Sequence, residues 1–497
     1  MIKKNSEKVK LEPLPIKYHS FKGVRAAARM LSGYSRSEPV LVYFDPDIDG
    51  LIAGYFVCSF LAQHGYKFCW YINENRQHGF MIPINSLKEK NIIAVDFHMM
   101  PDEIKAIVDS GSNIISMDHH ENEDFFIRYK SGCKEGLIIN NQYPFEEEDA
   151  RYLSGAGVVF ETLRLLDSSF DTVDNRALVG LTLLSDVCQI ENPNARAYLT
   201  DLYTHKYNGY IKYLIENTIG EVDYGFGIPR LDRNYVDYTF SPIINSVLRF
   251  NMGAMAVNFI LGQSGISRKC WEDQKTFVKK LREVANVKVY RGIYAVEIPE
   301  AVLDESERKI VSNFIGLVAS GYLDDGYSCI TYLRCIDGSI GRASFRGIEN
   351  GVDYLNTLNS MDLLLGVGHA SAFGVLKINP SEDLFKRIGL VCQKLSESGK
   401  GSTRVFECKN LSTWVANGKA QECAVENIFC LSQHRIYLKY TGDNVVRHRD
   451  STNYVEYSVD GISVKCFNRD YTPKNTLIMP MLERERVYFY LNKKEDV

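Results

Sequence analysis

An apolar run that ends in closely spaced aspartates is the feature that most constrains how this 497-residue chain can fold. Residues 40–44 read Val-Leu-Val-Tyr-Phe, and Asp45, Asp47 and Asp49 follow at alternate positions before Gly50. Three carboxylates this close repel one another, and a folded chain rarely keeps them together without a cation. Oxygen ligands of this kind suit Mg²⁺, Mn²⁺ or Ca²⁺. We therefore expect a metal site directly after a buried strand.

A calcium-binding EF-hand loop is the alternative interpretation, because it begins with the same D-x-D-x-D-G pattern. Such a loop needs a glutamate at its twelfth position, and counting from Asp45 that position is Phe56. The residues from Leu51 to Leu61 are mostly apolar, which is typical of a buried helix and not of a solvated loop. The sequence therefore predicts a strand–turn–helix unit, with its aspartates where α/β folds place their active sites.

Two further apolar runs end in acidic residues. Residues 91–95 precede Asp96, and residues 113–117 precede Asp118, His119 and His120. Strands that alternate with helices form a parallel sheet, whose carboxyl ends lie along one edge. A single aspartate at a strand end is usually a helix N-cap. Three such ends, one of them with adjacent histidines, favour a shared site.

The amino-acid composition excludes some classes of protein. The net charge of −4 argues against a chain that coats nucleic acid non-specifically, although it allows a local basic channel. The twelve cysteines form no C-x-x-C pair, which argues against a zinc ribbon and a disulfide framework and indicates thiols in a reducing compartment. With no signal-peptide core at the start and no apolar run of about 18 residues, we expect a cytoplasmic protein.

These motifs resemble the DHH phosphoesterase superfamily, and within it the RecJ-like single-strand exonucleases. The motif that names the superfamily corresponds to Asp118-His119-His120, and its first motif to Asp45-x-Asp47-x-Asp49. Asp96 resembles the acid of the second motif, and Asp186, which ends an apolar run, that of the fourth. Two further segments resemble family motifs. They are the loop Asn75-Arg76-x-x-Gly79-Phe80 and the helix start Ser154-Gly155-Ala156-Gly157-Val158.

The second half of the chain continues the resemblance in family order. Residues 241–249 and 313–320 are similar to RecJ segments, while residues 338–344 and 366–374 are similar to the phosphate-contact strand and histidine loop of a DHHA1 domain. The ordered similarity covers about residues 40–375.

The resemblance implies an α/β protein with four parts. A parallel-sheet DHH catalytic domain is expected over residues 1–204, a helical connector over 205–235, and a smaller α/β DHHA1 substrate-binding domain over 236–399. Alternating β-forming residues predict a C-terminal all-β domain over 400–497, and the family comparison favours an OB-like barrel. Its aromatic and basic residues suit base stacking and backbone contact, although packing in a core explains them equally well.

The resemblance also implies a ligand set and a substrate-contact set. Two Mn²⁺ ions, with Mg²⁺ as the alternative, would activate a water and neutralise phosphate charge. Their ligands would be Asp45, Asp47, Asp49, Asp96, His119 and Asp186, with Asp49 or Asp96 bridging. The catalytic residues would be His120, Asp118 and Asp47. Three roles are open for His120: it would contact the phosphate, transfer protons, or only hold the metal-binding loop in place by a hydrogen bond. Substrate contacts would come from Arg76, Asn245, Arg342, Ser344, Gly368 and His369.

The function implied by the resemblance is hydrolysis of single-stranded DNA from its 5′ end, with release of 5′-mononucleotides, in DNA repair and recombination. We expect a monomer, with single-strand-binding or other replication and repair proteins as further candidate partners. The alternatives are a phosphodiesterase for short RNA oligonucleotides or cyclic dinucleotides and a non-catalytic replication scaffold. Departures from the family pattern predict altered substrate handling without loss of a metal ligand; they are His98, Ile243, Val367 and Phe373.

Overall fold

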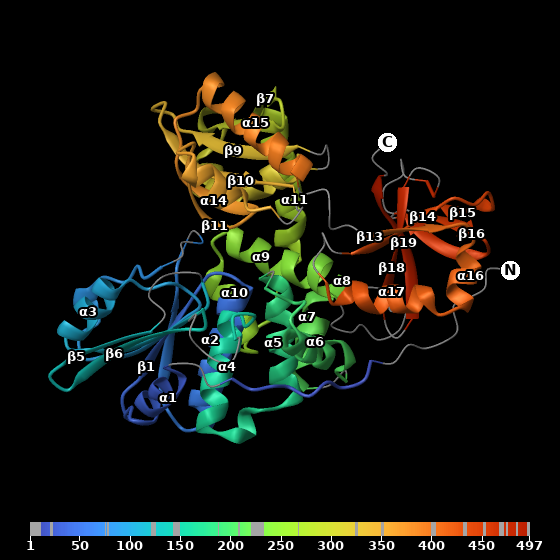
Figure 1. The fold of residues 1–497 in the computed structure, drawn as a ribbon. Helices are drawn as coiled ribbons and strands as arrows, with labels where there is room; N and C mark the ends of the chain where they lie inside the picture. The colour runs from blue at the N-terminus through green and yellow to red at the C-terminus, as the bar shows by residue number, and fades with distance from the viewer. Residues whose placement is uncertain are drawn as a thin grey trace. The chain divides into compact units, whose positions relative to one another are not determined.

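The computed structural model divides into two compact units, residues 10–270 (the first unit) and residues 271–482 with 486–497 (the second unit). The domain boundaries expected from the sequence stay predictions. The ribbon is drawn in Figure 1. The structure describes residues 11–19, 23–74, 76, 79–120, 126–142, 150–186, 188–206, 209–219, 233–266, 268–323, 327–348, 352–398, 404–430, 435–450, 454–466, 472–473, 476–483 and 486–494.

A six-stranded sheet in the order β2-β1-β3-β4-β6-β5 forms the centre of the first unit. All neighbouring pairs are parallel except β5–β6, which is an antiparallel hairpin at the edge. The predicted parallel sheet is therefore confirmed, and the hairpin extends it. The strands are β1 (Val40–Phe44), β2 (Phe68–Ile72), β3 (Asn91–Val95), β4 (Asn113–Asp118), β5 (Phe126–Ser131) and β6 (Lys134–Asn140).

Helices cover both faces of this sheet, and its central strands β1, β3 and β4 are accordingly buried along almost their whole length. On one face α3 packs against β4, β5 and β6, and on the other α2 packs against β1, α4 and α5. The helices are α1 (Val24–Ser32), α2 (Ile48–Gln63), η1 (Ile84–Ser86), α3 (Pro101–Asp109), α4 (Gly155–Leu166), η2 (Ser168–Phe170), α5 (Val173–Ser185), α6 (Pro193–Thr204), α7 (Gly209–Ile219), α8 (Arg233–Tyr235), the π-helical η3 (Val236–Phe240), α9 (Ser241–Arg249) and α10 (Gly253–Ile260).

The second unit contains a mixed sheet in the order β11-β12-β10-β9-β8-β7. Its apolar core packs against α14 and α15, with Phe345, Tyr354 and Phe373 at its centre. The strands are β7 (Asn286–Tyr290), β8 (Ile293–Pro299), β9 (Ser328–Arg334), β10 (Ile340–Arg346), β11 (Leu365–His369) and β12 (Ala372–Lys377). The helices are α11 (Lys269–Val284), η4 (Glu300–Val302), α12 (Glu305–Ile310), η5 (Val311–Asn313), α13 (Ile315–Ser320), α14 (Tyr354–Ser360) and α15 (Glu382–Ser398).

The C-terminal segment is β-rich, as predicted, but it differs from the expected OB-like barrel. An OB fold has five strands, whereas this sheet has seven, in the order β13-β14-β18-β19-β17-β16-β15. Two helices that were not predicted, α16 (Leu411–Ala416) and α17 (Lys419–Ile428), connect the parallel strands β13 and β14. Parallel neighbours need such a crossover. The strands are β13 (Arg404–Cys408), β14 (Ile436–Tyr440), β15 (Val445–Asp450), β16 (Val455–Val459), β17 (Ile462–Cys466), β18 (Thr476–Glu483) and β19 (Arg486–Lys494).

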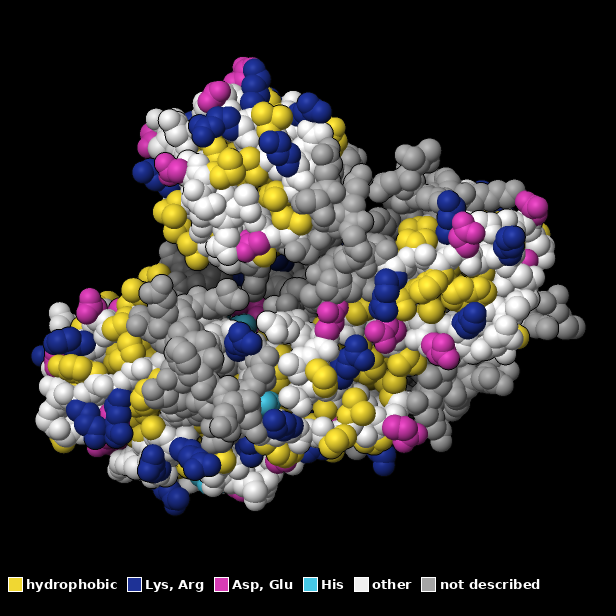
Figure 2. Space-filling view, viewed as in Figure 1, with side chains coloured by type: hydrophobic (Ala, Val, Ile, Leu, Met, Phe, Trp, Pro, Cys, Tyr) yellow, Lys and Arg dark blue, Asp and Glu magenta, His cyan; other side chains and the backbone are white. Residues whose placement is uncertain are grey.

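The surface carries charges of both signs. Lysine and arginine side chains are interspersed with aspartate and glutamate over the face shown in Figure 2, with hydrophobic side chains between them. This distribution agrees with the small net charge of the sequence. Within the described ranges, every helix is too short or too polar to cross a bilayer.

We predict that Gly54→Val destabilises the first unit. A Cβ at Gly54 would lie 2.1 Å from the ring of Phe44, because α2 packs directly on β1 and both residues are fully buried. Overpacking of this kind costs about 1–3 kcal/mol. Thermal melting followed by circular dichroism should show a lower Tm for this variant, while Gln63→Ala on an exposed turn of the same helix should melt like the wild type. Equal Tm values for all three proteins would contradict the prediction.

Candidate metal centre

The carboxyl ends of β1, β3 and β4 bring three aspartates to one edge of the first sheet. Asp45 follows β1, Asp96 follows β3, and Asp118 is the last residue of β4. The strands pair in parallel without a register shift, with Phe44 opposite Val95 and Val95 opposite Met117. The three acidic side chains are buried, at 0–1% exposure. The convergence predicted from parallel pairing is thus present in the fold.

The turn from β1 into α2 positions the other two aspartates of the first motif. Asp47 is the N-cap of α2, where its Oδ1 accepts a hydrogen bond from the Gly50 amide at 2.9 Å. A side chain at Gly50 would not fit, because its Cβ would lie 2.6 Å from the carbonyl oxygen of Asp45. Asp49 lies in the first turn of α2 and is 1% exposed.

The carboxylate of Asp49 bonds to the N-terminus of α4. Its Oδ2 accepts from the Gly155 amide at 2.6 Å and its Oδ1 from the Ala156 amide at 3.0 Å. The first amides of a helix have no partner within the helix and attract negative charge. Ser154 caps the same helix by accepting from Gly157, and its hydroxyl also lies 2.8 Å from that of Thr182. The helix start that resembles the family motif therefore holds a carboxylate of the site in place.

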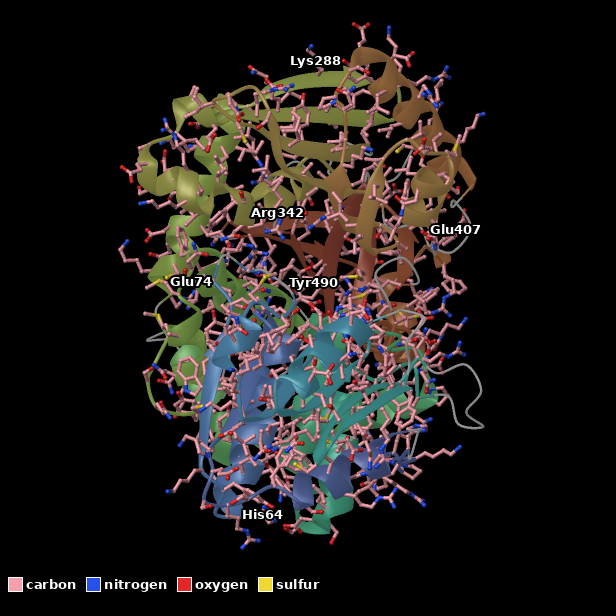
Figure 3. All side chains as sticks on the ribbon, turned by 90° about the vertical axis from the view of Figure 1, so that its left-hand side faces the viewer. His64, Glu74, Lys288, Arg342, Glu407 and Tyr490 are labelled. Carbon is pink, nitrogen blue, oxygen red and sulfur yellow. The ribbon has the colours of Figure 1, made fainter. Side chains whose placement is uncertain are left out.

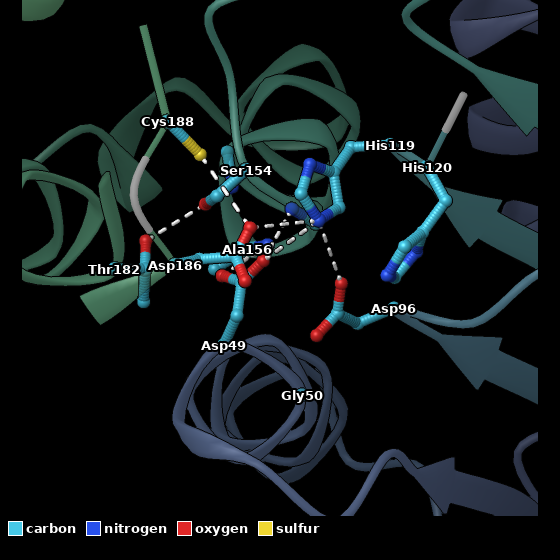
Figure 4. A network of polar contacts seen from close by, with 12 residues as sticks. Asp49, Gly50, Asp96, His119, His120, Ser154, Ala156, Thr182, Asp186 and Cys188 are labelled. Atoms are coloured by element: carbon cyan, nitrogen blue, oxygen red, sulfur yellow. Dashed lines mark hydrogen bonds and ion pairs between the residues drawn. The ribbon is translucent and has the colours of Figure 1, made fainter. Parts of the chain in front are cut away.

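His119 lies at the centre of the carboxylates (Figure 4). Its Nε2 is 3.2 Å from Asp186 Oδ2, 3.3 Å from Asp96 Oδ1 and 3.7 Å from Asp49 Oδ2. Asp186 reaches this position from the C-cap of α5, a helix, and its side chain is 16% exposed. One imidazole nitrogen thus faces acids from three different elements.

Several buried polar atoms of this cluster have no hydrogen bond within the described chain. They are both carboxylate oxygens of Asp96 and the Nε2 atom of His119. Asp96 also has a φ of 66°, a left-handed conformation that is strained for a residue with a side chain. Buried polar atoms nearly always find a partner in a folded protein. Oxygen and imidazole donors that are held in place and unsatisfied fit a divalent cation as their partner.

Crowding of the carboxylates changes their acidity. Burial raises the pKa of Asp96 well above its ordinary value, and the negative charges of Asp49, Asp47 and Asp45 raise it further. Burial also raises the pKa of Asp186 to about 7, with Asp49 adding to the effect and His119 opposing it. Without a cation, the cluster therefore retains protons near neutral pH.

The described residues contain three groups whose possible ligand atoms lie within 4.8 Å of one another. One group is Asp45, Asp47 and Asp96, and a second is Asp96, His119 and His120. The third is His119, Asp186 and Cys188. Because Asp96 and His119 each belong to two groups, the three groups form one continuous candidate metal centre.

Most residues of this centre lie in a part of the chain that matches a known family, and Asp186 and Cys188 lie just beyond that part. Residues 39–184 match the DHH family, N-terminal domain. This part of the chain is a DHH-family domain. A search of curated proteins found no match.

The fold of the whole chain is similar to solved RecJ structures. RecJ in complex with Mn²⁺ from Thermus thermophilus shares 17% identity at a TM-score of 0.65, over 97% of this chain and 73% of that chain. The Mg²⁺ complex from the same organism shares 15% identity at 0.59, over 98% and 72%. Exonuclease RecJ bound to manganese shares 20% identity at 0.51, over 78% of this chain and 96% of that one. The chain therefore has a RecJ-like fold, as the sequence resemblance implied.

In the DHH domain, Asp118 and His120 form a hydrogen-bonded pair next to the metal ligands. His120 Nδ1 lies 2.7 Å from Asp118 Oδ1, and the amide of Asn140 donates to Asp118 Oδ2 at 3.3 Å and to the carbonyl of His120 at 2.9 Å. Burial opposes a charge on His120, but the Asp118 carboxylate raises the pKa of the imidazole to about 10. Asp118, for which a catalytic role was predicted, thus holds His120 in position and favours its protonated form.

The predicted substrate-contact residues are distributed over both units. Arg76 lies in a turn and Asn245 on α9, both partly exposed and both in the first unit. The others lie in the second unit: Arg342 and Ser344 on β10, and Gly368 and His369 on β11. The side chain of Arg342, labelled in Figure 3, is exposed.

One of these six predictions, His369, can be described only in part. Ser344 is buried, and its hydroxyl accepts from Arg346 at 2.8 Å. Asn75 and the side chain of His369 lie outside the described residues. The substrate contacts of all six residues stay predictions.

Sequence reasoning missed two residues of the site. Asn140 follows the apolar residues 137–139 at the end of β6, so the same strand-end pattern that revealed the aspartates could have revealed it. Cys188 lies two residues after Asp186, and the spacing alone gave no reason to separate it from the other cysteines.

We predict that Asp96→Asn stabilises the metal-free protein and abolishes its response to Mn²⁺. The raised pKa of Asp96 means that ionising it in the fold costs stability above the unfolded pKa of about 4, and increasingly so as the pH rises. An amide removes this cost, and a gain of about 1–2 kcal/mol would raise Tm by about 2–8 °C at pH 8. Thermal melts with EDTA and with Mn²⁺ measure both effects. Asp102→Asn on α3 is the control, and a lower Tm for metal-free Asp96→Asn would contradict the prediction.

We also predict that the affinity for Mn²⁺ rises with pH. A cation must displace the protons that burial and neighbouring carboxylates keep on Asp96 and Asp186, and the pKa of Asp186 is raised to about 7. Displacement of one proton makes binding about tenfold weaker for each pH unit below that pKa. Isothermal titration calorimetry at pH 6, 7 and 8, in buffers of different ionisation enthalpy, would measure affinity and proton release together. Binding that is independent of pH would contradict this interpretation.

Proposed function

We propose that this protein is a metal-dependent hydrolase that cleaves the phosphodiester bonds of single-stranded DNA from the 5′ end and releases 5′-mononucleotides. The observation that carries the proposal is the cluster around His119, in which carboxylates from three elements, two of them buried, surround an imidazole nitrogen that has no hydrogen bond within the described chain. His119, Asp49 and Asp96 of this cluster lie in the part of the chain that matches the DHH family. Exonuclease activity is supported by the RecJ-like fold, since one of the similar structures is named exonuclease RecJ. The preference for DNA and the direction of cleavage come from the family resemblance of the sequence motifs.

The proposed cofactor is a pair of Mn²⁺ ions. The residues present fit divalent cations, because the donors are mostly carboxylate oxygens and imidazole nitrogen. Asp96 belongs to two of the overlapping ligand groups, which supports the view that it bridges two adjacent ions. The RecJ of similar fold from Thermus thermophilus has been solved with Mn²⁺ and with Mg²⁺, which supports Mn²⁺ with Mg²⁺ as the alternative.

The chemistry divides between the ions and the side chains. Bound divalent cations would supply an activated water and neutralise charge on the phosphate. The carboxylates of Asp45, Asp49 and Asp96 hold fixed positions on separate elements, so little reorganisation is needed when a substrate arrives. Asp118 bonds to Nδ1 of His120 and raises the pKa of the imidazole to about 10, so His120 would offer a proton on Nε2 to a phosphate or leaving oxygen.

The proposal also covers the compartment, the oligomeric state and the partners of the protein. The twelve cysteines, all within the described residues, form no disulfide, which supports a reducing compartment such as the cytoplasm. We propose a monomer that acts in DNA repair and recombination, with single-strand-binding or other replication and repair proteins as partners.

The test is degradation of end-labelled substrates by the full-length protein with Mn²⁺. Single-stranded DNA labelled at the 5′ end should release labelled mononucleotide first, while duplex DNA, short RNA and a cyclic dinucleotide should be cleaved more slowly. Asp186→Asn should reduce the rate at least about 100-fold, because it removes a charged ligand needed for transition-state stabilisation, and Asp102→Asn should match the wild type. Faster cleavage of short RNA or the cyclic dinucleotide would favour the alternative phosphodiesterase. Identical traces for wild type and Asp186→Asn would support a non-catalytic role.

We further predict that Arg342→Ala raises KM for single-stranded DNA with a smaller effect on kcat. The guanidinium is exposed on β10, and loss of one charge-assisted hydrogen bond costs about 1.5–3 kcal/mol, or roughly 10–150-fold in binding. Lys377→Ala, which removes an exposed cation from the neighbouring strand β12, is the matched control. Steady-state kinetics at two salt concentrations measure the effect. An unchanged KM would remove Arg342 from the proposed substrate contacts.

A further inference from the structure

The candidate metal centre contains a sulfur donor at one end. The ligand atoms of His119, Asp186 and Cys188 lie within 4.8 Å of one another. Cys188 Sγ is 3.7 Å from Asp186 Oδ2, which in turn is 3.2 Å from His119 Nε2 (Figure 4). Among the groups of possible ligands in the described chain, this is the one that includes a cysteine.

The end of α5 explains why the sulfur lies there. The amide of Asp186 bonds to Thr182 O at 3.0 Å, and that of Cys188 bonds to Leu183 O at 3.1 Å. The amide of Ile190 then bonds to Cys188 O at 2.7 Å, which continues the turn. These backbone bonds keep the chain folded against the end of the helix. The thiol is thus held beside the carboxylate by local structure.

The donors at this end differ chemically from those at the other end. Asp45, Asp47 and Asp96 offer only oxygen, which suits Mg²⁺ and Mn²⁺. Imidazole, carboxylate and thiolate together suit Zn²⁺ or Co²⁺, since sulfur ligands select softer ions. The Nε2 atom of His119, a residue 8% exposed, has no hydrogen bond among the described residues. This nitrogen, 3.2 Å from Asp186 Oδ2, is therefore the imidazole donor that the group would offer to a metal ion.

We propose that His119, Asp186 and Cys188 form a thiophilic metal position that takes Zn²⁺ or Co²⁺ in preference to Mg²⁺. When the ion binds, a metal–sulfur bond forms, the S–H bond of Cys188 breaks and its proton passes to solvent, with no change of oxidation state. Zn²⁺ at this position uses two of the side chains that the proposed nuclease site needs. The position itself does not depend on nuclease activity, so its test can succeed or fail separately.

The first experiment titrates the metal-free, full-length protein with Co²⁺ and follows its absorption spectrum. The wild type should develop a thiolate-to-cobalt charge-transfer band in the near ultraviolet, and added Zn²⁺ should remove it. Cys188→Ser and Cys188→Ala should lack the band. Their affinity for Zn²⁺ should fall at least about tenfold, because even replacement of outer-shell groups weakens metal binding by about 10–100-fold. Their affinity for Mg²⁺ should stay unchanged.

The control is Cys133→Ser, which removes an exposed thiol between β5 and β6 and should leave the band intact. A band of wild-type strength in either Cys188 variant, or unchanged affinity for Zn²⁺, would overturn the proposal.

A second experiment needs no variant. X-ray absorption of the wild type loaded with one equivalent of Zn²⁺ should show one sulfur neighbour at about 2.3 Å beside nitrogen and oxygen neighbours at about 2.0–2.2 Å. A shell of nitrogen and oxygen alone would overturn the proposal even if the variants failed to fold.

Discussion

Mutual repulsion among buried carboxylates is the constraint on which the first unit depends. Asp45, Asp49 and Asp96 are at most 1% exposed, and burial together with their neighbours raises the pKa of Asp96 well above its ordinary value. The fold offsets part of this electrostatic cost with the positively polarised amides at a helix N-terminus. Two amides at the start of α4, the positive end of the helix dipole, bond to Asp49. A divalent cation would offset the rest.

The same constraint explains several local features that are otherwise unfavourable. Gly50 and Gly155 occupy positions where a Cβ would collide with Asp45 and Asp96. Asp96 adopts a left-handed backbone conformation, and its carboxylate has no hydrogen bond within the described chain. Strain and unsatisfied polar atoms persist only where the surrounding structure imposes them and where binding uses them. In this domain they occur together, at the point where the proposed ions would bind.

The candidate metal centre has two chemically distinct ends, and this difference bears on how a site of this kind can vary within one fold. The strand-end aspartates provide oxygen, and the strands impose their spacing. The end of α5 provides Asp186 and, two residues later, Cys188, whose thiol donates to the Asp186 carboxylate at 3.7 Å. A scaffold that fixes the carboxylates and leaves a helix terminus adjustable can alter its preference among ions with a single substitution. Metal choice would then depend on residues beyond the motifs that identify the family.

The sequence by itself determined the strands, their parallel pairing and the acids at their ends, because apolar runs that stop at aspartates are local signals with a regular geometric consequence. It did not predict α16, α17 or the seven-stranded C-terminal sheet, since alternating β-forming residues do not specify strand order. Only the tertiary structure showed that Asn140 anchors Asp118 and that Cys188 lies beside Asp186 and His119. The strand-end pattern could have marked Asn140, but its contact with Asp118 depends on the pairing of β4 with β6. The contact of His119 with Asp186 and Cys188 depends on how the end of α5 lies beside the end of β4.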